Sequence, residues 1–166
     1  MTLNEPVTAL TDYAAALVSL GFALSMYRRV GPGNRVSAWF WCASFLAAAG
    51  AAAFGGTFHG FSAALSRGAL QGLWNSSMVL IGVSVAFVAA AVHGAHVRRI
   101  DRTVHWLVAG IVVSFAGLAV QQSDLRIGIL NHNDIYHLIQ IAGLFLLFRC
   151  ARTTRDRGAF TASVAT

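Results

Sequence analysis

The 166-residue sequence has no lysine, only six acidic residues and only two cysteines. All twelve basic residues are arginines, which we interpret as the codon bias of a GC-rich bacterial genome. Cys42 and Cys150 are too few and too far apart for a cysteine metal motif, so we expect them to be packing residues. Charged residues make up 11% of the chain and hydrophobic residues 57%, which is typical of a polytopic membrane protein rather than a soluble domain.

The sequence is poor in charged residues but rich in long apolar stretches. Five occur, near residues 6–27, 37–62, 69–93, 104–122 and 131–150. A helix of about 20 apolar residues crosses a bilayer core, and lipid offers backbone groups no other partners. We therefore predict an all-α bundle of five transmembrane helices in one domain over residues 1–152, followed by a polar, disordered tail over 153–166. The acidic start, MTLNEPVTALTD, does not resemble a signal peptide.

The arginines indicate the orientation of this bundle. Five helices place ten of them on one side, in three groups: Arg28, Arg29 and Arg35; Arg98, Arg99 and Arg102; and Arg149, Arg152, Arg155 and Arg157. Only Arg67 and Arg126 fall on the other side. The positive-inside rule then predicts an outside N-terminus and a cytoplasmic C-terminus, in a multi-pass protein of a bacterial inner membrane. Topology accounts for the net charge of +6, so no nucleic-acid partner is expected.

Polar residues gather at the predicted outer end, and polar residues in membrane spans are functional candidates. Glu5, Thr8 and Asp12 lie within about 60° on one helix face. Asp12 is two turns inside the span, where capping does not explain it. Glu5 precedes Pro6, so it is either a helix-start residue or a second acid that passes protons.

The second and fifth helices carry the candidate metal ligands. In AAAGAAAFGGTFHGF, Ala51, Gly55 and His59 form a smooth face, which we expect to pack against the fifth helix so that His59 meets His137. In HNDIYH, residues Asn133, Asp134, His137 and Gln140 share an arc of about 120°, whereas His132 points away. His59 and His137 with one carboxylate, Asp134 or alternatively Asp12, and an open water position would suit zinc, or non-haem iron with more open positions.

Amides and an indole complete the candidate site. We assign Asn75 a catalytic role beside Asp12 and Glu5. Asn133, Gln121 and Trp74 are the candidate substrate contacts. Asn75 and Gln121 have the alternative role of interhelical hydrogen bonding.

Three segments, GTFHGF, LWNSSMVLIGVSVAF and NDIYHLIQIAGLFLLFR, resemble in order the signature helices of the CREST superfamily, which includes alkaline ceramidases, adiponectin receptors and hemolysin III-like proteins. The resemblance implies a zinc ion that activates water for amide hydrolysis in lipids, with His59 and His137 as ligands. The sequence departs from the family pattern at Gly55, Asn75 and Asn133, which replace a serine, an aspartate and the third histidine, and it has five helices rather than seven. It also resembles small uncharacterised bacterial membrane proteins with GTxHG and NDIYH motifs.

These patterns predict a zinc-dependent membrane hydrolase that acts on a lipid or amide substrate. The first alternative is metal-ion or proton binding or transport without catalysis, although the apolar inner halves of the helices count against a channel. A second alternative is a pair of haems between an outer set (His59, His132, His137) and an inner set (His93, His96, His105); we do not favour it. A purely structural or partner-binding role is the third.

Overall fold

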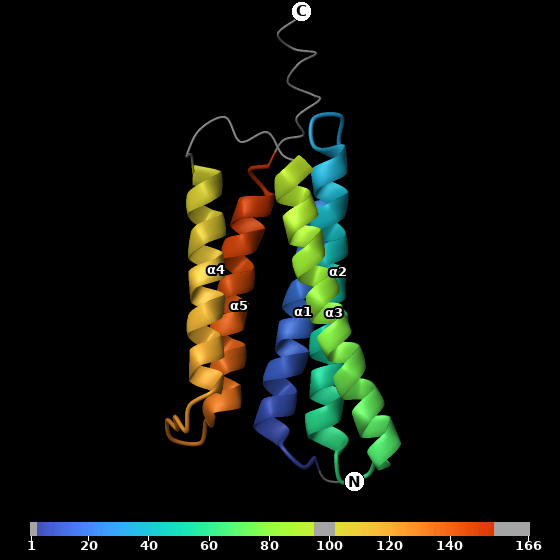
Figure 1. Cartoon of the computed structure of the whole chain (residues 1–166), viewed down its shortest axis with the longest axis vertical. Helices are drawn as coiled ribbons and strands as arrows, with labels where there is room; N and C mark the ends of the chain where they lie inside the picture. Colours follow the sequence, from blue (N-terminus) through green and yellow to red (C-terminus); the bar gives the residue numbers. More distant parts are fainter. Residues whose placement is uncertain (1–2, 95–101, 155–166) are drawn as a thin grey trace, which may run out of the picture.

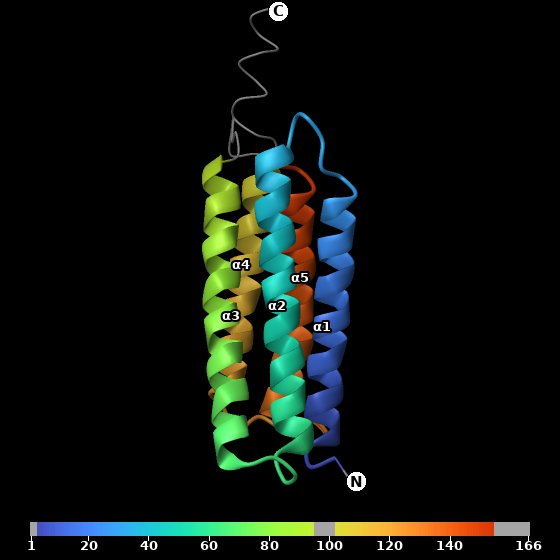
Figure 2. The same ribbon diagram turned by 90° about the vertical axis from the view of Figure 1, so that its right-hand side faces the viewer.

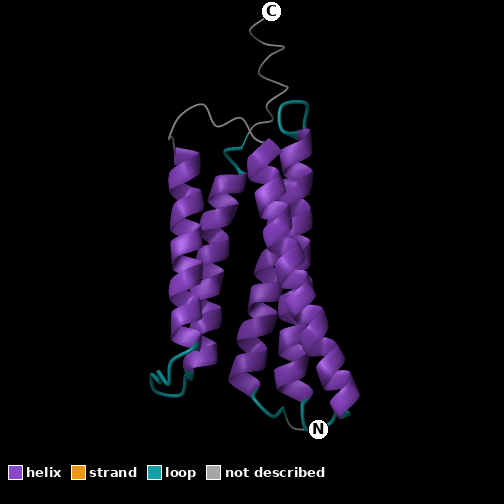
Figure 3. Ribbon diagram, in the orientation of Figure 1, coloured by secondary structure: helices purple, strands orange, loops and turns teal. Residues whose placement is uncertain are grey.

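The computed structural model describes residues 3–94 and 102–154 and contains five α-helices in this part of the chain (Figures 1 and 3). These helices confirm the all-α prediction. All five are long and apolar enough to cross a membrane. The predicted ends lie within two residues of the observed ones. The helices are α1 (Pro6–Tyr27), α2 (Arg35–Phe61), α3 (Arg67–Gly94), α4 (Arg102–Gln121) and α5 (His132–Ala151). Of the predicted tail, residues 155–166 lie outside the described residues.

The helices form two layers, with α1, α2 and α3 in one and α4 and α5 in the other (Figures 1 and 2). Helix α2 packs between α1 and α3, α4 packs on α5, and α1 joins the two layers through α5. Only 11% of the spanning residues of α3 and of α4 are buried, against 33% in α1 and 44% in α2. Helices α3 and α4 are therefore the two edges, and α1 is the link between the hairpins α2–α3 and α4–α5.

An aromatic core holds α1, α2 and α5 together in the half of the bundle where α1 ends and α2 begins. The ring of Phe22 stacks on Phe148 with 4.3 Å between centroids, and the Phe45 ring meets Phe22 edge-on at 5.6 Å. Trp41 and Met26 are buried beside them. Cys42 and Cys150 belong to the same cluster, which agrees with the packing role expected for them.

The opposite half is held together by a close approach of α1 to α2. A Cβ atom added to Gly55 would lie 3.2 Å from both carboxylate oxygens of Asp12, and one added to Gly56 would lie 3.1 Å from the Asp12 Cβ. The prediction that this glycine face packs on the fifth helix is wrong, because α1 occupies it and α2 makes few contacts with α5. An added Cβ at either position would be tighter than an ordinary contact, so glycines make room for the Asp12 carboxylate between the two helices.

Candidate functional site

Asp12 of α1 and His137 of α5 form a buried pair. The Nδ1 atom of His137 lies 3.2 Å from Oδ1 of Asp12, and the side chains are 15% and 3% exposed. The second carboxylate oxygen, Oδ2, is buried without a hydrogen-bond partner among the described residues. The sequence-derived assignment of Asp12 and His137 to one site therefore agrees with the geometry.

The start of α5 fixes the position of His137. Asn131 caps the helix: its Oδ1 accepts hydrogen bonds from the backbone N–H groups of Asn133 (2.8 Å) and Asp134 (3.1 Å). The Oδ2 atom of Asp134 accepts the N–H of Asn131 at 2.8 Å, which completes a capping box. His137 follows Asp134 by three residues, so it lies on the same side of the helix one turn further on.

Asp134 also joins α5 to α1. The hydroxyl of Thr8, one turn before Asp12, donates to Oδ1 of Asp134 at 2.7 Å, and both residues are 1% exposed. Both carboxylate oxygens of Asp134 thus already accept hydrogen bonds. The structure gives Asp134 the roles of a cap and a helix link, and its role as a metal ligand stays a prediction.

A second pair joins α1 to α2 at the rim of the bundle. The Nδ1 atom of His59 lies 2.8 Å from Oε2 of Glu5, whose side chain is 45% exposed. Asn4 strengthens the same junction, since its backbone N–H donates to the carbonyl of Gly60 (3.1 Å) and its amide donates to Ser62 Oγ (2.8 Å). Glu5 stands at the N-cap position, but its side chain makes no capping bond. It serves as the partner of His59 instead.

Together these groups form one polar band, the carboxylate–histidine layer, which comprises Glu5, Thr8, Asp12, His59, Asp134 and His137. Each histidine faces its carboxylate through Nδ1. When a carboxylate accepts the Nδ1 proton, the Nε2 atom carries the lone pair. Only the His59–Glu5 contact has hydrogen-bond geometry, whereas His137 lies at ion-pair distance from Asp12. The layer therefore presents one imidazole oriented by a hydrogen bond and a second held beside its carboxylate.

Trp74 contacts the layer indirectly, because the ring of Phe58 lies between Trp74 and His59. Its ring is 5.6 Å from that of Phe58, which meets the His59 ring edge-on at 5.3 Å. Gln121 and Asn133 are half-buried, and neither side chain makes a hydrogen bond with a described residue. Their predicted role as substrate contacts stays a prediction.

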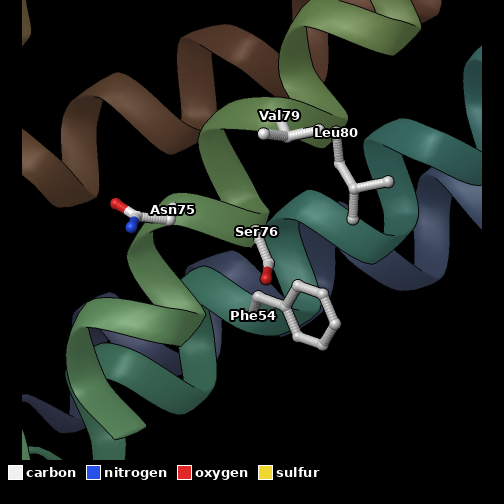
Figure 4. Close-up of a pocket in the computed structure, with 5 residues that line it drawn as sticks. All are labelled: Phe54, Asn75, Ser76, Val79 and Leu80. Atoms are coloured by element: carbon white, nitrogen blue, oxygen red, sulfur yellow. The ribbon is translucent and has the colours of Figure 1, made fainter. Parts of the chain in front are cut away.

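Asn75 does not join the layer. Its side chain is exposed on α3 and accepts a hydrogen bond from Gln71, one turn earlier in the same helix, at 2.8 Å. It lines an open groove of about 410 Å³ between α2 and α3, with Phe54, Ser76, Val79 and Leu80 (Figure 4). Ser76 points toward Phe54, whereas the Asn75 amide points away from it. Among the described residues Asn75 makes no interhelical hydrogen bond, and its catalytic role stays a prediction.

The donor set of the layer does not make a complete catalytic zinc site. Within residues 3–94 and 102–154, no group of three or more His, Cys, Asp and Glu side chains is arranged to hold a metal ion. Of the inner set proposed for haem, His93 and His105 lie at the opposite end of the bundle, and His96 lies outside the described residues.

Sequence reasoning missed the capping box and the link from Thr8 to Asp134. The segment Asn131-His-Asn-Asp134 carries the signal, because a capping residue followed three positions later by an acid marks a helix start. The Thr8–Asp134 contact has no such signal. The contact forms because α5 packs against α1, and the sequence does not reveal which helices are neighbours.

The chain belongs to a family of unknown function, DUF6962, whose profile matches residues 7–99 and 88–156. No curated protein and no solved structure matches the chain significantly. The resemblance to the CREST superfamily stays a prediction.

Proposed function

We propose that this is a multi-pass protein of a bacterial inner membrane, with the N-terminus outside and the C-terminus in the cytoplasm. The exposed apolar side chains on α3 and α4, such as Val79, Val85 and Phe115, suit contact with lipid. The uneven distribution of arginines supports the orientation. Reporter fusions at Thr166 and in the loop near Ala64 should report opposite sides of the membrane. If both report the same side, the orientation is wrong.

Within this setting, we propose that the carboxylate–histidine layer binds a transition-metal ion through the Nε2 atoms of His59 and His137. One observation carries the proposal: both imidazoles contact a carboxylate through Nδ1. Metal-binding histidines commonly donate their other ring N–H to a carboxylate, which fixes the tautomer and the ring orientation. Asp12 and Glu5 would then orient the ligands rather than act as acids in catalysis.

Binding without catalysis fits these residues better than zinc-dependent hydrolysis does. Catalytic zinc sites use three protein ligands and one water. Neither candidate third ligand, Asp134 or Asp12, forms a group of three with the two histidines that could hold a metal ion in the described part of the chain. The aromatic core around Phe22, Phe45 and Phe148 fills the other half of the bundle. We therefore propose a metal-binding site that opens toward one side of the membrane, without a continuous path to the other side.

Zinc titration of the detergent-purified chain, without a histidine tag, tests this proposal. Wild type should bind about one Zn²⁺ per chain, whereas His59→Ala and His137→Ala should each lose binding. Glu5→Gln and Asp12→Asn should weaken binding by roughly 10–100-fold, the usual effect of losing an orienting partner.

His132→Ala is the matched control, because it removes an imidazole from the same end of the bundle without touching either pair. Its zinc affinity should equal that of wild type. Equal affinity in wild type, His59→Ala and His137→Ala would overturn the proposed site.

A further inference from the structure

Arginines dominate the end of the bundle opposite the carboxylate–histidine layer. Five whose side chains are described lie there, where α1 ends, α2 begins and α5 ends (Figures 1 and 2). All are exposed: Arg28, Arg29, Arg35, Arg149 and Arg152. We refer to these five as the arginine surface.

The described carboxylates leave this surface without neutralising partners. Glu5, Asp12 and Asp134 belong to the layer at the other end, and Asp124 lies in the α4–α5 loop, also at that end. The described ion pairs are those of His59 and His137, and none includes an arginine. Asp101 and Asp156 lie outside the described residues. The arginine surface is thus a concentrated positive charge.

Aromatic rings hold two of these guanidinium groups in place. Arg149 of α5 lies over the ring of Trp106 of α4, 4.9 Å from its centroid. Arg152 lies over Phe148 at 5.8 Å, and Phe148 stacks on Phe22 of α1. A guanidinium group over an aromatic ring gains electrostatic attraction, and its N–H groups stay exposed to a second partner.

A further aromatic pair lies at the same end. Tyr27 and Trp39 contact each other edge-on at 5.7 Å, with 56% and 47% of their surfaces exposed. Exposed tyrosine and tryptophan rings at a helix end are typical of the level of lipid headgroups, where one part of the ring contacts acyl chains and the polar atom contacts water.

We propose that the arginine surface binds the phosphate groups of anionic phospholipids. Guanidinium groups match phosphate oxygens in both charge and fork geometry. Lipid, rather than free phosphate, is the partner that also reaches the exposed rings of Tyr27 and Trp39. This interaction is independent of metal binding at the opposite end.

Thermal unfolding of the full chain in a neutral detergent tests the proposal. Phosphatidylglycerol should raise the melting temperature more than phosphatidylcholine with the same acyl chains. The double variant Arg149→Gln/Arg152→Gln should lose at least half of that difference. Arg67→Gln/Arg126→Gln removes the same charge from the other end and should keep it. High salt should reduce the difference in wild type, because exposed charges are screened.

Three results would overturn the proposal. The two lipids could act alike on wild type, or the two double variants could lose the same share of the effect. Inorganic phosphate at the concentration of the lipid could also reproduce the full shift, which would point to a free anion. If the glutamine variant fails to fold, Arg149→Lys/Arg152→Lys keeps the charge and removes the fork. That variant should lose part of the phosphatidylglycerol effect, and an unchanged effect would count against phosphate recognition by these two residues.

Discussion

The Asp12–His137 and Glu5–His59 pairs contain the same chemical groups in different surroundings. Asp12 is 3% exposed and lies between α1, α2 and α5, whereas Glu5 is 45% exposed at the rim. The rim pair has the shorter contact, 2.8 Å against 3.2 Å. Contact length therefore does not indicate which pair matters more for the fold.

The burial of the carboxylate decides how much each pair contributes to stability. When an exposed ion pair is broken, water replaces the lost partner, so such pairs contribute about 0–1 kcal/mol. A buried group that loses its partner keeps the full cost of its desolvation, roughly 1–3 kcal/mol. We therefore assign the stability of the layer to Asp12 and its neighbours on α1, and assign to Glu5 the orientation of the His59 imidazole.

The largest expected effect comes from filling the space beside Asp12. Gly55→Leu should lower the free energy of unfolding by about 3 kcal/mol, the upper part of the range for overpacking, because even its Cβ would lie 3.2 Å from both Asp12 oxygens. Unfolding by sodium dodecyl sulfate in mixed micelles measures the change. Gly82→Leu is the control, since nothing lies within 4 Å of a Cβ there. A similar loss in both variants would show that Asp12 is not tightly enclosed.

Replacing each acid by alanine compares the two pairs directly. Asp12→Ala should cost about 2 kcal/mol, because the His137 ring stays enclosed without its partner. Glu5→Ala should cost less than about 0.5 kcal/mol, since the Glu5 carboxylate is 45% exposed and water already screens the pair. The same micelle titration measures both. Equal losses would contradict the assignment of stability to the buried pair.

The helices were predictable because their signals are local. Each span needs about 20 apolar residues, and Pro6 at the first position of α1 marks a helix start. The choice of Asp12, Glu5, His59 and His137 as site candidates followed from their cost inside a membrane span. All four lie in the carboxylate–histidine layer.

The pairing of these residues was not predictable, because helical periodicity gives the face of a helix and not its neighbour. The glycine face at Gly55 could accept any helix, and it accepts α1 rather than α5. Asn75 shows the same limit, because the sequence does not reveal that α3 is an edge helix on which this side chain is exposed. Neighbour choice depends on side-chain packing across several helices at once.

A smaller effect than that of Asp12→Ala tests whether Thr8 links the layer to α5. Thr8→Val keeps the shape of the side chain but removes the hydroxyl that donates to Asp134 at 2.7 Å. Asp134 retains its bond from the Asn131 N–H, so its carboxylate stays partly satisfied. The loss should therefore be about 1 kcal/mol, the ordinary net value of one hydrogen bond.

Thr11→Val is the matched control for this prediction. The Thr11 hydroxyl donates at 2.9 Å to the carbonyl of Thr8 within the same helix, and removing it breaks no contact between helices. Its effect on unfolding in mixed micelles should be close to zero. If Thr8→Val were as mild as Thr11→Val, the link between α1 and α5 would depend on the Asp12–His137 pair and the aromatic stack alone. A loss that vanishes in the background of Asp134→Ala, which removes the acceptor, would instead attribute the effect to the Thr8–Asp134 bond.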